Sequence, residues 1–88
     1  MKVINNTDKL KRVFAESLGI SANKVKNSLA YQKEPKWDSI SHMVLVSNIE
    51  NEFEISFDTD EVIAMSTFAI AVKILKKHKI NFNNVTKK

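Results

Sequence analysis

The sequence predicts an all-α domain: a small four-helix bundle with three longer helices, one short helix and a long loop between the first two helices. Apolar residues recur at helical spacing in three separate segments. The chain contains one Gly and one Pro, so it offers few of the tight turns that a many-stranded sheet requires. It has 88 residues and no Cys, which fits one domain without disulfides or a thiolate metal site. We expect this domain to span residues 1–80, followed by a flexible tail over residues 81–88.

The first helix is expected between Thr7, whose hydroxyl can cap it, and Gly19, which can adopt the left-handed conformation that ends many helices. Its core-facing residues are Leu10, Val13, Phe14 and Leu18. Residues 20–36 lack a sustained period and form the long loop, with one helical turn expected near residues 22–25. Three apolar residues would hold this loop against the core: Ile20, Val25 and Leu29.

The second helix is expected over about residues 39–53. Placing residues at 100° intervals gives a core-facing arc that includes His42, expected to be a structural histidine, and the apolar residues Leu45, Val46, Ile49 and Phe53. Another apolar group lies outside this arc and beside Ser39, where packing of the core does not require it: Ile40, Met43 and Val44. We therefore expect Leu45, Ile49 and Phe53 to be buried, and Ile40 and Met43 to be largely exposed.

Two further helices complete the bundle. A short acidic helix begins near Asp58, with Glu61 three residues later in a capping-box arrangement. The last helix is expected to be capped by Ser66 or Thr67. One of its faces is apolar, and basic residues in its final turn complement the helix dipole: Lys76, Lys77 and His78.

The net charge of +4 is unevenly distributed. Residues 1–37 carry +5 and residues 62–88 carry +6, whereas residues 38–61 carry −7 and contain no Lys or Arg. An acidic middle suits a basic protein partner better than a phosphate backbone, so we expect no nucleic-acid partner. No segment approaches the roughly 20 apolar residues of a membrane span, and the N-terminus lacks a hydrophobic signal core. We expect a cytoplasmic monomer without membrane insertion.

One stretch connects the long loop to the second helix: Trp37-Asp38-Ser39-Ile40-Ser41-His42-Met43, followed by Leu45, Ile49 and the run Glu50-Asn51-Glu52-Phe53-Glu54-Ile55. It resembles the acyl carrier protein family, in which an Asp-Ser-Leu motif opens the second helix and an "E-x-E-F" run closes it. The resemblance covers about residues 10–75. Ile40 takes the place of the commoner Leu, and the basic ends differ from the acidic composition of many members. The change to Ile40 is conservative in bulk, whereas the basic ends favour a carrier of a specialised pathway over the general fatty-acid carrier.

The resemblance implies that Ser39 bears a covalent phosphopantetheine, with Asp38 as its acidic motif neighbour. In this family a separate phosphopantetheinyl transferase moves the arm from coenzyme A onto the serine hydroxyl. The terminal thiol then holds an acyl or aminoacyl cargo as a thioester, for the enzymes that load and transfer it. Docking of these partners is expected on side chains near the arm, namely Ile40, Met43, Val44, Glu50, Glu54, Asp60 and Glu61.

The residues themselves suggest no catalysis by the chain. No nucleophile-base-orienter set is recognisable, which agrees with a non-catalytic carrier. No metal is expected, because His42 has no second ligand at the i+4 position.

Several alternatives remain open. Ser39 could be no more than a helix N-cap, and the acidic run could be an ordinary solvated surface. A small basic helical module could bind nucleic acid through Lys9, Lys11, Arg12 and the lysines of the last helix. A plain helical interaction domain is the third possibility. The intact mass after purification would separate a carrier from both others.

Overall fold

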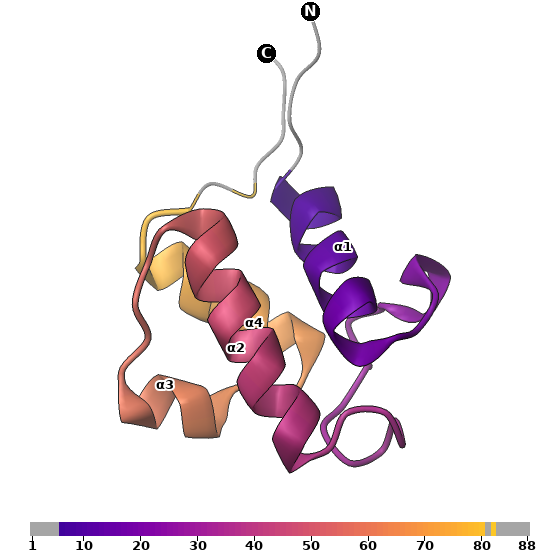
Figure 1. Cartoon of the computed structure of the whole chain (residues 1–88). Helices are drawn as coiled ribbons and strands as arrows, with labels where there is room; N and C mark the ends of the chain where they lie inside the picture. The colour runs from indigo at the N-terminus through magenta and orange to yellow at the C-terminus, as the bar shows by residue number, and fades with distance from the viewer. Residues whose placement is uncertain (1–5, 81, 83–88) are drawn as a thin grey trace, which may run out of the picture.

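A computed structural model of the chain describes residues 6–80 and 82, and within this part it contains four α-helices and one short 3₁₀-helical turn (Figure 1). In chain order these are α1 (Asn6–Leu18), η1 (Ala22–Lys24), α2 (Ser39–Phe53), α3 (Thr59–Ala64) and α4 (Phe68–Lys77). The all-α prediction is confirmed, as are the long segment between α1 and α2 and the helical turn within it. The predicted tail lies outside the described residues except for Phe82, which is partly buried and packs against the core.

The three longer helices pack around a common interior, and α3 crosses one end of the bundle. Figure 1 shows α1 beside α2, with α4 behind α2 and α3 to the left of the lower half of α2. The centre of the core is aromatic: the Phe14 ring lies edge-on to Trp37 at 5.4 Å between centroids and to Phe68 at 5.0 Å. These three side chains come from α1, the long loop and α4, so one cluster holds three distant segments together.

The helix boundaries follow local chemistry. Gly19 has φ of 69° and ends α1 in the left-handed conformation, with the N–H of Ile20 returning to the Ala15 carbonyl at 3.0 Å. Thr67 caps α4 by accepting the Ile70 N–H, and Asp58 and Glu61 form the predicted capping box on α3. The prediction that Thr7 caps the first helix is wrong, because α1 already begins at Asn6.

The long segment between α1 and α2 is fixed to the rest of the chain. Val25 and Leu29 are buried, and Ile20 is partly buried against the core, as predicted. The backbone also pairs across the molecule: the Tyr31 N–H donates to the Ser66 carbonyl at 2.9 Å, and the Phe68 N–H donates to the Leu29 carbonyl at 3.1 Å. These bonds pair backbone groups of the long segment with those at the start of α4. They also anchor the segment that leads into α2.

Candidate functional site

Ser39 is the first residue of α2, and its neighbour Asp38 is the cap. The Asp38 backbone is extended, and its carboxylate accepts the Ser41 N–H at 2.9 Å. That hydrogen bond, together with a further one from the Ser41 side chain, holds the pKa of Asp38 below its usual value. Ser39 is exposed, and within the described part of the chain its hydroxyl has no hydrogen-bond partner. The alternative that Ser39 serves only as an N-cap is therefore wrong.

The backbone beneath Ser39 is held by a buried tryptophan and a histidine. Trp37 is fully buried, and its Nε1 donates to His42 Nδ1 at 2.9 Å. Because Nδ1 accepts, the proton of the neutral ring is on Nε2, which donates to the Val62 carbonyl at 2.9 Å. The Trp37 and His42 rings are stacked with their centroids 6.0 Å apart, and the centroid of the Tyr31 ring lies 5.4 Å from that of the imidazole. His42 is thus a structural histidine, as predicted, and it joins the start of α2 to α3.

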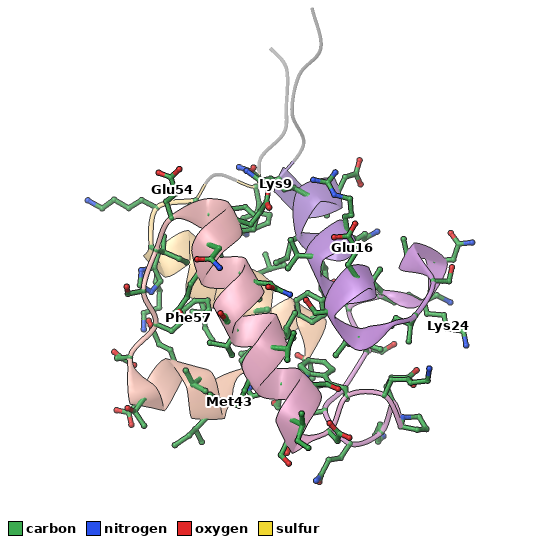
Figure 2. The ribbon with its side chains drawn as sticks, in the orientation of Figure 1. Lys9, Glu16, Lys24, Met43, Glu54 and Phe57 are labelled. Carbon is green, nitrogen blue, oxygen red and sulfur yellow. The ribbon has the colours of Figure 1, made fainter. Side chains whose placement is uncertain are left out.

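Apolar side chains surround this end of α2 without being buried. Ile40 is 76% exposed, Met43 58% and Val44 46%, whereas Leu45 and Ile49 are fully buried and Phe53 is 9% exposed. The predicted division of α2 into a core-facing arc and an outer group is confirmed. Figure 2 shows Met43 where α2 borders α3. We refer to Ile40, Met43 and Val44 as the outer apolar group.

The short helix α3 adds a residue that the sequence did not single out. Ile63 is 74% exposed. It lines a hollow of about 260 Å³ with His42, Val62 and Met65. With six residues, α3 is too short for its apolar residues to define a buried face, so helical periodicity could not predict that Ile63 is exposed.

The four carboxylates proposed for docking fall into two classes. Glu54 and Asp60 are exposed. Glu50 is half-buried, and its Oε2 accepts the Phe57 N–H at 2.8 Å, which fixes the connection between α2 and α3. Glu61 is buried: its Oε1 accepts from Asp58 N at 3.2 Å and from His78 Nε2 at 2.9 Å.

The environment of Glu61 perturbs its titration. The hydrogen bond from His78 is the main cause that lowers the pKa of Glu61, with the Asp58 N–H and the Lys77 charge adding to it. Lys77 Nζ lies 3.8 Å from the carboxylate. Glu61 therefore joins α3 to the end of α4, so less of this side chain is available to a partner than the sequence suggested.

The basic residues of the nucleic-acid alternative are dispersed. Lys9 Nζ lies 3.7 Å from the Glu52 carboxylate and 4.9 Å from the centre of the Phe53 ring, so it faces α2. Lys77 faces Glu61.

The described residues offer no site for a metal ion, because no three His, Cys, Asp or Glu side chains lie close enough together to bind one. None of the helices in residues 6–80 has the length and the apolar composition of a membrane span. No protein-family model matches the chain.

Proposed function

We propose that this protein is a carrier whose Ser39 hydroxyl is modified with phosphopantetheine, so that a thioester-bound acyl or aminoacyl group is presented to partner enzymes. One observation supports the proposal most directly. At the start of α2 the capping role belongs to Asp38, which leaves the exposed Ser39 hydroxyl without a hydrogen-bond partner among residues 6–80 and 82. The resemblance of the surrounding residues to the acyl carrier protein family supplies the identity of the modification.

The position suits a phosphodiester. Ser39 lies at the N-terminus of a helix of 15 residues, where the macrodipole and the free N–H groups of the first turn favour negative charge. The exposed side chain can accept a bulky substituent without displacing the core. Asp38 brings a like charge close by, but both groups would be in water, which screens their repulsion.

The modification requires no catalytic group from this chain. A base on the transferase removes the Ser39 hydroxyl proton as the oxygen attacks the phosphorus next to the pantetheine in coenzyme A. The new Ser39 oxygen–phosphorus bond forms as the bond to the bridging oxygen of the pyrophosphate breaks, and the bisphosphorylated adenosine leaves. The thiol of the attached arm supplies the thioester chemistry. The residues of the chain itself position the serine and the surface around it.

Partner docking is proposed on the outer apolar group, with Glu54 and Asp60 as the exposed charges. Exposed apolar side chains that gather beside a reactive group are typical of interaction surfaces, and a flexible Met adapts to different partners. The exposed carboxylates would attract a basic enzyme surface and raise the encounter rate. Glu50 and Glu61 contribute charge to this region, but their oxygens are already engaged within the chain.

The direct test is labelling. Purified protein incubated with coenzyme A and a phosphopantetheinyl transferase should gain the mass of one phosphopantetheine group. Ser39→Ala should abolish the gain and leave the helical content unchanged. The matched control is Ser41→Ala, two residues further along the same helix, which should be labelled like the parent protein. Labelling that persists in Ser39→Ala would refute the proposed site.

The docking surface has a separate test. Reversing Glu54 and Asp60 to Lys should slow transfer at low ionic strength, and added salt should reduce the difference between variant and parent. Reversing Lys73 and Lys76 on α4 to Glu is the control with the same number of charges changed. Equal slowing by both pairs would mean that the acidic surface has no special role in recognition.

A further inference from the structure

A second surface lies away from Ser39, between α1 and η1. There the protein has an open hollow of about 900 Å³. Its floor includes Val25 and Phe68, both almost completely buried, and its rim carries Lys11, Arg12 and Lys26. Figure 2 shows Lys24 of η1 on this side of the molecule, opposite Glu54 and Phe57. We call this feature the basic hollow.

The cations around the basic hollow differ from Lys9 and Lys77 in having no ion-pair partner among the described residues. Lys9 is paired with Glu52, and Lys77 is paired with Glu61. Within the described part of the chain, no ion pair involves Lys11, Arg12 or Lys26. Asp8 is the only acidic residue among the described residues that line the hollow. The positive charge of this rim is therefore largely uncompensated.

The hollow is held in shape before any partner arrives. Ser21 caps η1 by accepting the Asn23 N–H, and the Val25 N–H donates to the Ala22 carbonyl at 3.0 Å. Val25 fixes the end of this turn in the core. Because η1 is anchored, ordering it costs little when a ligand binds. Lys11 and Arg12 of α1 and Lys26, two residues after η1, line the same space.

We propose that the basic hollow docks an acidic segment of a partner protein, one in which carboxylate side chains flank an apolar residue. The three rim cations match carboxylates, and the side-chain amides of Asn23 and Asn27 can both donate to and accept from a peptide backbone. The apolar residue would contact Ala22, which lines the hollow and is exposed, since Val25 and Phe68 expose almost no surface. The residues of the chain outside the described part contain no Asp or Glu, so they cannot supply the acidic segment.

A nucleic acid fits this surface less well. A phosphate backbone is bound by basic residues that follow its track, whereas here the cations gather at one hollow. The basic final turn of α4 lies at another part of the molecule (Figure 1), and its Lys77 is engaged by Glu61. A partner held at the basic hollow would leave the α2–α3 surface free, so it could remain bound while an enzyme approaches Ser39.

The test uses the full chain and a fluorescently labelled peptide in which Glu residues flank one Leu, with a Gln version as the control peptide. The Glu peptide should bind, and the affinity should fall with added salt. Lys11→Glu combined with Arg12→Glu should weaken binding by about tenfold, which corresponds to about 1.4 kcal/mol. Lys73→Glu combined with Lys76→Glu is the matched control and should change the affinity by less than about threefold. Ser39→Ala should bind like the parent, which separates this proposal from the carrier function.

Four results of the binding experiments would overturn the proposal. They are no binding of the Glu peptide up to about 1 mM, equal binding of the Gln peptide, equal loss in both double variants, and tighter binding of a single-stranded oligonucleotide with the same number of charges. Concentration-dependent self-association that Lys11→Glu and Arg12→Glu abolish would also overturn it, since the occupant would then be a second copy of this chain.

Discussion

The two ends of α2 use their polar groups in opposite ways. At the first turn Asp38 accepts the Ser41 N–H, the Ser39 hydroxyl has no hydrogen-bond partner in the described part of the chain, and the outer apolar group is exposed. At the last turn the Glu50 carbonyl accepts the N–H groups of Glu54 and Ile55, and the Glu50 carboxylate accepts that of Phe57. Acidic residues that are close in sequence therefore need not share a role. A carboxylate near a chain reversal is readily used to hold that reversal, whereas one on the open surface stays available to a partner.

The largest change in stability is expected when apolar residues at the two ends of α2 are truncated. Phe53→Ala should lower the free energy of unfolding by about 3–5 kcal/mol, because it removes a buried ring and leaves a cavity. Met43→Ala should change it by less than about 0.5 kcal/mol, since Met43 is exposed. Urea denaturation followed by circular dichroism would measure both. A loss of several kcal/mol in Met43→Ala would contradict the assignment of the first turn to the surface.

A smaller change in stability is expected when the carboxylates of Glu50 and Glu54 are removed. Glu50→Ala should cost about 1–3 kcal/mol, because the Phe57 N–H loses a charged acceptor while remaining partly buried. Glu50→Gln keeps an acceptor oxygen and should recover part of this loss. Glu54→Ala should have little effect, because the Glu54 side chain is exposed. Equal destabilisation by Glu50→Ala and Glu54→Ala would remove the distinction between the two positions.

Glu61 makes the stability of the fold depend on pH. Its pKa is lowered in the folded protein from an ordinary value of 4.5, so the folded state favours the ionised carboxylate. This contribution to stability is present above pH 4.5 and is lost as the pH falls through the lowered folded pKa. Glu61→Gln should remove that part of the acid sensitivity when unfolding is measured from about pH 7 to about pH 3. Asp60→Asn, at an exposed position, is the control. If it altered the pH dependence of stability as much as Glu61→Gln, the hydrogen bond between His78 and Glu61 would have no special role.

The smallest expected effect is a gain in stability at the end of α2. Glu54 has φ of 57°, a left-handed conformation that costs a residue with a Cβ about 1–2 kcal/mol relative to the right-handed one. Gly adopts this conformation freely but loses more entropy on folding, so Glu54→Gly should stabilise the protein by at most about 1 kcal/mol. A decrease in the denaturation midpoint would show that the Glu54 side chain contributes more than its exposure suggests.

The sequence was sufficient for features that depend on neighbouring residues. Helical periodicity separated Leu45 and Ile49 from Ile40 and Met43, and the residue types at Asp58 and Thr67 marked two helix starts. Adjacent Asp38 and Ser39 are both good capping residues, so local preference could not decide which of them caps α2. The backbone geometry resolved that choice.

Features that depend on distant residues were not predictable. The bond from Tyr31 to Ser66 and that from His78 to Glu61 join segments far apart in the chain, and no spacing in the sequence encodes them. For the same reason Glu61 was expected on the docking surface, although the fold turns it inwards. The basic hollow likewise arises only when η1 folds back beside α1.

Trp37 gives this protein a built-in optical reporter. It is the single tryptophan of the chain, and it directly precedes Asp38 and Ser39. Its indole is shielded from water and hydrogen-bonded to an imidazole that also contacts α3. Any event that shifts α3 or loosens the loop before Ser39 changes the polarity and the quenching that this one indole experiences. Its emission spectrum can therefore follow events at this end of α2 in the unlabelled protein, in real time and without an introduced dye.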